Sequence, residues 1–140
     1  MQVPGRGFRM KANVFRRALK DSKLRELMLR YTLALISQIS QSAACNRLHS
    51  VDARCARWLL VTHDRVKKQT FPLTQEFLAQ MLGVRRASVS GAAGMLQKRG
   101  LITYKRGIIH ISDRRGLEAA SCGCYLVIRN EFKRLLGRIG

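Results

Sequence analysis

The feature that most constrains the fold is a long stretch of helical periodicity from Lys23 to about Leu48. Alternating steps of four and three residues connect Leu24, Met28, Tyr31, Leu35, Gln38, Ser42 and Cys45. This spacing is typical of a seam between packed helices. A second stripe, formed by Leu29, Leu33 and Ile36, lies on a different side of the helix. A helix with two apolar stripes needs two partners, and we expect them to be the rest of the chain and a second copy of it.

The seam is apolar mainly in its N-terminal half, because positions 38, 42 and 45 are polar or small. We therefore expect a homodimer whose interface contains Leu24, Met28, Tyr31 and Leu35. So small a body can cover only one side of a helix about 39 Å long. The alternative is a core helix inside a monomer.

The composition indicates a folded, strongly basic protein. The chain has 140 residues, 27 Lys and Arg against 8 Asp and Glu, and a formal net charge of +19. Its hydrophobic content of 46% excludes a disordered basic tail. No apolar run fits a membrane span, and the first residues lack the apolar region of a secretory signal. We expect a cytoplasmic protein that binds a polyanion and no membrane.

Shorter elements flank the long helix. Residues 1–9 are expected to be irregular or to form one short strand, followed by a short helix from Met10 to Lys20. Asp21 and Ser22 are expected to form a break followed by the N-cap of the long helix. After the long helix, Ser50 is predicted to cap a helix that runs to about Val66. Residues 71–73 are expected to be extended, because proline disfavours the helical conformation in the residue before it.

The most informative stretch runs from Thr74 to Arg99. Thr74 is predicted to cap a helix that buries Leu78, Met81 and Leu82, and Gly83 can take the left-handed conformation that ends it. A second helix from Arg86 to Arg99 buries the apolar positions Val89, Ala93 and Leu96. Two short helices joined by a glycine-bearing turn form a helix-turn-helix.

The exposed face of the second helix is predicted to be small and positively charged. It consists of Arg85, Arg86, Ala87, Ser88, Ser90, Gly91 and Gly94. Small side chains let a helix approach base edges closely, and an arginine at its start can bind guanine through two hydrogen bonds. The alternative is an ordinary helical hairpin with solvated arginines.

Two β-rich segments, 101–104 and 108–111, follow with a basic turn of Lys105, Arg106 and Gly107 between them. A helix-turn-helix followed by a hairpin is a winged helix. Residues 85–115 contain eight Lys or Arg and one acid, a local charge of +7. A final helix is expected from Arg114, capped by Asp113, to about Leu136. The predicted fold is thus mainly α with a small β-hairpin.

The four cysteines, at positions 45, 55, 122 and 124, are expected to be reduced structural thiols. Cys122 and Cys124 have no second cysteine pair and no histidine at ligand spacing, and His49, His63 and His110 are scattered. We expect no metal site and no cofactor. Few acidic residues and no catalytic constellation indicate that the protein is not an enzyme.

The stretch from about Leu27 to Phe132 resembles the C-terminal half of Crp/Fnr-type bacterial transcription regulators. The resemblance is carried by LMLRYTLALISQISQSAACNRLHSVDARCARWLL and by LTQEFLAQMLGVRRASVSGAAGMLQKRGLITYKRGIIHI. It implies a dimerising long helix and a winged helix-turn-helix that reads a near-palindromic operator, with RNA polymerase as a further candidate partner. It also implies phosphate contacts at Thr74 and Ser88 and a base-reading role for Arg86. Operator sequence is not implied, because Ala87 and Gly91 stand where the family often has an acidic residue and a second arginine.

Regulators of this family also carry an N-terminal cyclic-nucleotide-type β-barrel. The start of this chain, MQVPGRGFRMK, resembles the last strand and exit of that barrel, so we expect a fragment or the product of a truncated gene. The predicted organisation is a connector at 1–22, a dimerisation helix at 23–48 and a winged helix-turn-helix domain at 49–140.

The function predicted from the sequence is sequence-specific binding of double-stranded DNA by a homodimer that regulates transcription. The residues expected to contact DNA are Thr74, Gln75, Arg85, Arg86, Ser88, Ser90, Lys105 and Arg106. One alternative is a non-specific, nucleoid-type nucleic-acid binder, given the high charge. Another is a winged-helix module that binds a protein partner.

Overall fold

The computed structural model describes residues 7–137, which form seven helices and a three-stranded antiparallel sheet. The helices are α1 (Ala12–Ala18), α2 (Ser22–Leu48), α3 (Val51–Val66), α4 (Gln75–Leu82), α5 (Arg86–Lys98), α6 (Arg114–Ala120) and α7 (Cys124–Leu136). The strands are β1 (Thr70–Pro72), β2 (Ile102–Lys105) and β3 (Ile108–Ile111). The predicted fold class is confirmed.

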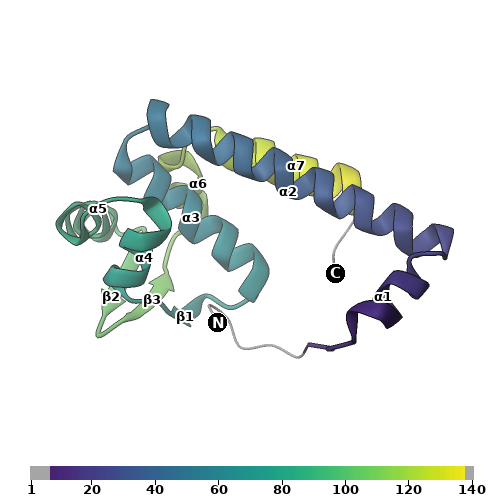
Figure 1. Ribbon diagram of the computed structural model, residues 1–140. Coiled ribbons are helices and arrows are strands. Elements are labelled where there is room, and N and C mark those ends of the chain that lie inside the picture. The colour runs from purple at the N-terminus through teal and green to yellow at the C-terminus, as the bar shows by residue number, and fades with distance from the viewer. Residues whose placement is uncertain (1–6, 138–140) are drawn as a thin grey trace.

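The long helix predicted from the four-three spacing is α2, and the C-terminal helix α7 packs beside it (Figure 1). The helix-turn-helix and the sheet lie together at the C-terminal end of α2, and α1 lies at its other end. The strand considered for residues 1–9 falls largely outside the described residues, and residues 7–11 form no regular element.

Side-chain caps begin several helices where the sequence predicts them. The hydroxyl of Ser50 accepts from the backbone N–H of Ala53, and the Asp113 carboxylate accepts from that of Gly116. At the start of α2 the cap is Asp21, one residue before the predicted position, and its carboxylate accepts from the backbone N–H groups of Lys23 and Leu24. These bonds satisfy backbone donors that have no partner within the helix, which fixes where each helix starts.

The sheet has the strand order β1-β3-β2. The predicted hairpin is confirmed, with Ile102 opposite Ile111 and Lys105 opposite Ile108. Its two-residue turn places Arg106 at φ 50° and Gly107 at φ 76°, the pairing typical of a type I′ turn. The extended segment predicted near Phe71 is strand β1, which pairs with β3 on the edge of the sheet, where a proline is tolerated.

The main core lies between α3, α4, α5, α6 and the sheet. Its fully buried large side chains include Leu59, Leu60, Leu82, Ile102, Ile109 and Leu117. The predicted buried face of α4 is confirmed for Leu78 and Leu82 but is wrong for Met81, which is 44% exposed. Met81 lies roughly 100° around the helix from the centre of the side formed by the buried Leu78, Ala79 and Leu82, so solvent reaches it.

The single helix predicted from Arg114 to Leu136 is interrupted at positions 121–123. Ser121 is extended, at φ −79° and ψ 159°, and its hydroxyl donates to the backbone carbonyl of Glu118 at 2.8 Å. Serine competes for backbone hydrogen bonds in this way, and glycine at position 123 weakens a helix further. The interruption lets α7 leave the direction of α6 and follow α2 (Figure 1).

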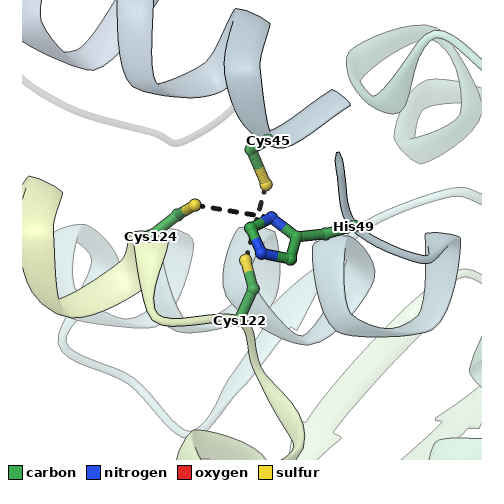
Figure 2. Close-up of side chains that lie close together, drawn as sticks. All are labelled: Cys45, His49, Cys122 and Cys124. Atoms are coloured by element: carbon green, nitrogen blue, oxygen red, sulfur yellow. Dashed lines mark hydrogen bonds between the residues drawn. The ribbon is translucent and has the colours of Figure 1, made fainter. Parts of the chain in front are cut away.

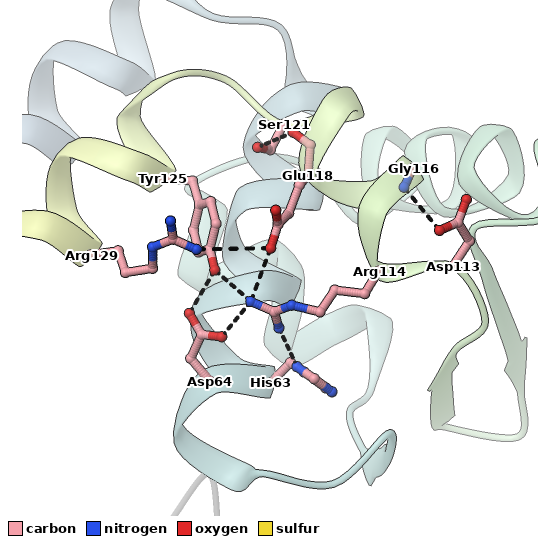
Figure 3. Close-up of polar contacts among 9 residues, drawn as sticks. All are labelled: His63, Asp64, Asp113, Arg114, Gly116, Glu118, Ser121, Tyr125 and Arg129. Carbon is pink, nitrogen blue, oxygen red and sulfur yellow. Dashed lines mark hydrogen bonds and ion pairs between the residues drawn. The ribbon is translucent and has the colours of Figure 1, made fainter. Parts of the chain in front are cut away.

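A polar network joins α3, α6 and α7 (Figure 3). Arg114 on α6 donates to Asp64 at 2.8 Å and to the hydroxyl of Tyr125 at 2.7 Å. Arg114 also pairs with Glu118 at 3.1 Å, and the guanidinium of Arg129 lies 5.3 Å from the centre of the Tyr125 ring. The network fixes the three helices against one another beside the core. None of the helices within residues 7–137 has the combination of length and apolarity that a membrane crossing requires.

Candidate nucleic-acid interface

Helices α4 and α5 form the predicted helix-turn-helix. Gly83 ends α4 in the left-handed conformation, at φ 63°, and the N–H of Val84 bonds back to the carbonyl of Ala79 at 3.1 Å. The buried side of α5 contains the predicted Val89, Ala93 and Leu96, together with Ala92. The turn chemistry and the apolar spacing therefore set the angle at which α5 lies on the domain surface.

The opposite side of α5 is exposed and carries small residues. Ala87, Ser88, Ser90, Gly91 and Gly94 are all exposed. A Cβ atom added at Gly91 or at Gly94 would meet no atom within 4 Å. Packing within the chain therefore does not require these two glycines, although each interior glycine destabilises a helix by roughly 1 kcal/mol relative to alanine.

The start of α5 lies open. Its N-cap is Arg85, and no side chain among the described residues caps the first turn. Backbone N–H groups at the start of a helix attract anions, because they lack intrahelical acceptors and stand at the positive end of the helix dipole. Arg85 and Arg86 place two cations at the same end.

Four of the predicted DNA-contacting residues line one surface hollow. Thr74 and Gln75 come from the start of α4, Arg86 from the start of α5, and Arg106 from the tip of the hairpin. Glu76, Tyr104 and Gly107 complete the lining. Residues separated by up to 33 positions in the chain thus meet at one basic hollow.

Tyr104 also lines this hollow, although its sequence position predicts only a strand residue. Burial raises its pKa, while a hydrogen bond with the backbone of Gln75 and the charge of Arg86 act in the opposite direction. Its backbone N–H donates to the side-chain oxygen of Gln97 at 2.7 Å. The sequence feature that could have identified Tyr104 as a site residue is its aromatic side chain directly before Lys105 and the hairpin turn.

The other predicted contact residues lie outside the hollow but are exposed around it. They are Arg85, Ser88, Ser90 and Lys105. Arg114, in contrast, is paired with Asp64 and Glu118. It contributes to the local charge of +7 counted from the sequence but is held inside the network of Figure 3.

On α2, the predicted dimer residues lie on the side that turns toward the chain's own body. Leu24, Met28 and Leu35 are half-buried, and Tyr31 is 42% exposed. Tyr31 and Leu35 line a hollow together with Ile128 and Phe132 of α7. The other side of α2 is more exposed, with Leu29, Leu33, Ile36 and Ile39 between 48% and 66%.

The expectations that His49 is isolated and that Cys122 and Cys124 have no histidine near them are wrong. Cys45 and His49 at the end of α2 meet Cys122 and Cys124 at the α6–α7 connection, with all four ligand atoms within 4.8 Å of one another (Figure 2). The missed signal was the Cys45–His49 spacing of four residues, which places both side chains on one face of a helix. The two halves are 73 residues apart in sequence, and local periodicity does not predict their contact.

Comparison with known proteins identifies the same domain. A family model described as a Crp-like helix-turn-helix domain matches residues 53–120. A search of the curated proteins found no match. The matched residues run from the third residue of α3 to the end of α6 and include the sheet and every residue that lines the hollow.

Solved structures match over a larger part of the chain. One, from Eubacterium rectale and described as a transcriptional regulator of the Crp/Fnr family, is 24% identical, has a TM-score of 0.61, and matches over 78% of this chain and 51% of its own. The Catabolite Activator Protein of Thermus thermophilus is 25% identical, with a TM-score of 0.47 and coverages of 77% and 45%. The chain thus spans about half the length of these structures. The family match and the shared fold confirm the resemblance seen in the sequence: residues 53–120 match a Crp-like helix-turn-helix domain.

Proposed function

We propose that this protein is a sequence-specific regulator of transcription that binds double-stranded DNA as a homodimer. The observation that carries the proposal is the convergence of Thr74, Gln75, Arg86 and Arg106 on one hollow of a Crp-like domain. In a helix-turn-helix the second helix enters the major groove and its first residues reach base edges. Here that helix is α5, and Arg86 is its first residue.

The roles of the residues follow from their chemistry and position. Arg86 is the base-reading residue, since an arginine can donate two hydrogen bonds to guanine. Thr74 and Gln75 at the start of α4 bind phosphate, together with the open N-terminus of α5. The Thr74 hydroxyl accepts from Phe77 at 3.2 Å, which leaves its proton for a phosphate oxygen.

Arg106 acts on the DNA backbone or the minor groove. It stands at the tip of the hairpin in a turn of two residues, so it projects beyond the strands. A cation in this position neutralises a phosphate without reading a base. The exposed face of α5, with Gly91 and Gly94, lets the helix approach the groove closely.

We further propose that the second copy of the chain covers the exposed stripe of Leu29, Leu33, Ile36 and Ile39. The two buried residues of α2, Ala34 and Cys45, lie roughly 160° around the helix from this stripe, at 100° per residue. The contact with α7 therefore uses one side of α2 and leaves the other for a partner. The seam predicted from spacing, Leu24, Met28, Tyr31 and Leu35, is the alternative surface.

The test is selection of binding sites from a random DNA library by three proteins: wild type, Arg86→Ala and Arg106→Asn. Asparagine is the matched replacement at position 106, because it accepts the left-handed conformation of a type I′ turn. Loss of a two-bond guanine contact should cost about 1–3 kcal/mol and relax one base pair in each half-site. Loss of a phosphate contact should weaken all sequences alike and lower the salt slope by about one unit.

We therefore expect Arg86→Ala to flatten the selected motif at one position and Arg106→Asn to preserve it with lower affinity. Uniform weakening by Arg86→Ala, with the wild-type motif intact, would make Arg86 a phosphate ligand. If wild type enriches no motif, the proposal of sequence specificity is wrong.

A further inference from the structure

Three cysteines and one histidine form a cluster where the end of α2 meets the α6–α7 connection (Figure 2). The Sγ atoms of Cys45 and Cys122 are 3.4 Å apart, and Cys124 Sγ lies 3.6 Å from His49 Nδ1. All three cysteines are buried. Each of the four residues thus directs a soft or borderline ligand atom toward the same small volume.

We propose that Cys45, His49, Cys122 and Cys124 form a structural zinc site. Cys₃His is one of the ligand sets that hold structural Zn²⁺ in tetrahedral geometry. Four ligands leave no open position for a substrate, so the site supports the fold and has no catalytic role. On binding, the three thiols lose their protons to solvent, and the ion takes three thiolates and one neutral imidazole.

The spacing of the ligand atoms fits one ion. With Zn–S bonds of about 2.3 Å, the edges of a regular tetrahedron measure about 3.8 Å. The Cys45–Cys122 and Cys124–His49 separations are 3.4 and 3.6 Å, and the largest of the set is within 4.8 Å. Small side-chain rotations therefore suffice to bind Zn²⁺. An iron–sulfur cluster places several iron and sulfide atoms between its ligands and requires a wider set.

The surroundings favour a negatively charged site. Zn²⁺ with three thiolates has a net charge of −1, and Arg57 acts electrostatically on Cys124. Arg57 is 6% exposed, and its Nε atom has no hydrogen-bond partner among the described residues. A buried cation without a full set of partners is costly, and a nearby anionic site offsets that cost.

An outer hydrogen bond also supports the cluster. The side-chain N–H of Gln41, one turn before Cys45 on α2, donates to Cys124 Sγ at 3.1 Å. Partners of this kind orient metal ligands and stabilise the thiolate. We assign Gln41 as a positioning residue of the site.

The consequence of zinc binding is a fixed junction between α2 and the helix-turn-helix domain. Cys45 and His49 lie at the end of α2, just before α3 begins at Val51, whereas Cys122 lies in the interruption between α6 and α7 and Cys124 is the first residue of α7. One ion thus joins the long helix to both ends of the domain that follows it.

Co²⁺ titration of the reduced, metal-free chain under anaerobic conditions tests the proposal. We expect one Co²⁺ per chain, with the visible bands of tetrahedral cobalt and thiolate-to-cobalt charge transfer, and displacement by Zn²⁺. Cys45→Ser, Cys122→Ser and His49→Ala should remove this spectrum, and Gln41→Ala should weaken binding by ~10–100-fold. Thermal denaturation should give a lower midpoint after chelation.

Two controls separate loss of a ligand from loss of the fold. Cys55→Ala removes the fourth cysteine, which is buried in the main core and whose pKa is raised to about 12 by burial and by Asp52; it should keep the cobalt spectrum. Cys124→His keeps four ligands, so it should still bind Co²⁺. Its thiolate-to-cobalt charge-transfer band should be weaker, because two thiolates remain instead of three.

The proposal is wrong if the folded, reduced wild-type chain binds no stoichiometric Co²⁺ or Zn²⁺. It is also wrong if the spectrum survives in the Cys45, Cys122 and His49 variants. A Cys45–Cys122 disulfide in the isolated chain, with no metal bound after reduction, would identify a redox pair instead.

Discussion

The hydroxyl of Tyr125 donates to Asp64 Oδ2 at 2.8 Å, and this bond joins α7 to α3. Arg114 donates to the same hydroxyl and to the other oxygen of Asp64, at 2.7 and 2.8 Å (Figure 3). Hydrogen bonds to charged groups contribute more than neutral ones. Burial and the neighbouring Asp64 raise the pKa of Tyr125, so the hydroxyl remains protonated and able to donate.

Tyr125→Phe should therefore lower the free energy of unfolding by about 1–2 kcal/mol. Urea denaturation followed by circular dichroism measures this difference. Tyr31→Phe is the matched control, because Tyr31 is 42% exposed on α2 and its substitution should change stability by less than about 0.5 kcal/mol. Equal denaturation midpoints for Tyr125→Phe and wild type would show that the network does not stabilise the fold.

The same network predicts a pH dependence through His63. Arg114 donates to Nδ1 of His63, which requires that nitrogen to be unprotonated. Burial and the charge of Arg114 lower the pKa of His63 below its usual 6.5, and Asp64 opposes them. The unfolded chain therefore binds the proton more readily than the folded chain.

The contribution of His63 should be complete above pH 6.5 and should decrease as the pH falls from 6.5 through the lower folded-state pKa. His63→Asn keeps an acceptor near the position of Nδ1 and cannot titrate. Denaturant unfolding at several pH values should show a steeper loss of stability for wild type than for this variant. Parallel curves for the two proteins would contradict the role given to His63.

The glycines of α5 should favour DNA binding at the expense of stability. Gly94→Ala should stabilise the fold by about 0.5–1 kcal/mol, because the added Cβ meets no atom and alanine favours a helix. The same change should weaken DNA binding if this face lies against the groove. Thermal denaturation and fluorescence anisotropy with labelled DNA measure the two effects.

Gly100→Ala is the control for Gly94→Ala, because it should change stability in the opposite direction. Gly100 ends the α5 region at φ 70°, so an alanine there should destabilise the fold by about 1–2 kcal/mol without crowding the exposed face. If Gly94→Ala leaves the DNA affinity unchanged, the exposed face of α5 with its small residues is not part of the DNA interface.

The proposed dimer surface can be tested by comparing two double variants of α2. Leu33→Asp with Ile36→Asp introduces two charges into the exposed stripe and should convert a dimer into a monomer in sedimentation experiments. Met28→Asp with Leu35→Asp makes the same charge change on the alternative seam. Dissociation by the second pair alone would assign the dimer contact to that seam. A wild-type chain that is monomeric at high micromolar concentration would rule out both surfaces.

The elements whose structure is decided by short-range chemistry were predictable from the sequence. The caps at Ser50, Thr74 and Asp113 and the left-handed Gly83 follow from residue type, so the helix-turn-helix was predictable within a few residues. The predicted contact residues Arg86 and Arg106 converge because two such local elements, a helix start and a hairpin turn, lie on one compact domain.

What the sequence did not reveal depends on long-range packing. The interruption at Ser121 and Gly123 breaks a continuous apolar period, and it sends α7 back along α2. That return buries the side of α2 that contains Cys45 and brings Cys45 to Cys122. Neither the burial of this side of α2 nor the contact between Cys45 and Cys122 can be predicted from the residue spacing within α2 or within α7 alone.

The most direct test of the account compares wild-type affinity for the selected DNA duplex with affinity for a scrambled duplex of equal length. Both affinities are measured by fluorescence anisotropy at the same physiological salt concentration, since phosphate contacts alone bind any sequence. The account predicts at least ~10³-fold tighter binding to the selected duplex. Equal affinities would identify a non-specific, nucleoid-type binder, and no binding to either duplex even at low salt would identify a protein-interaction module.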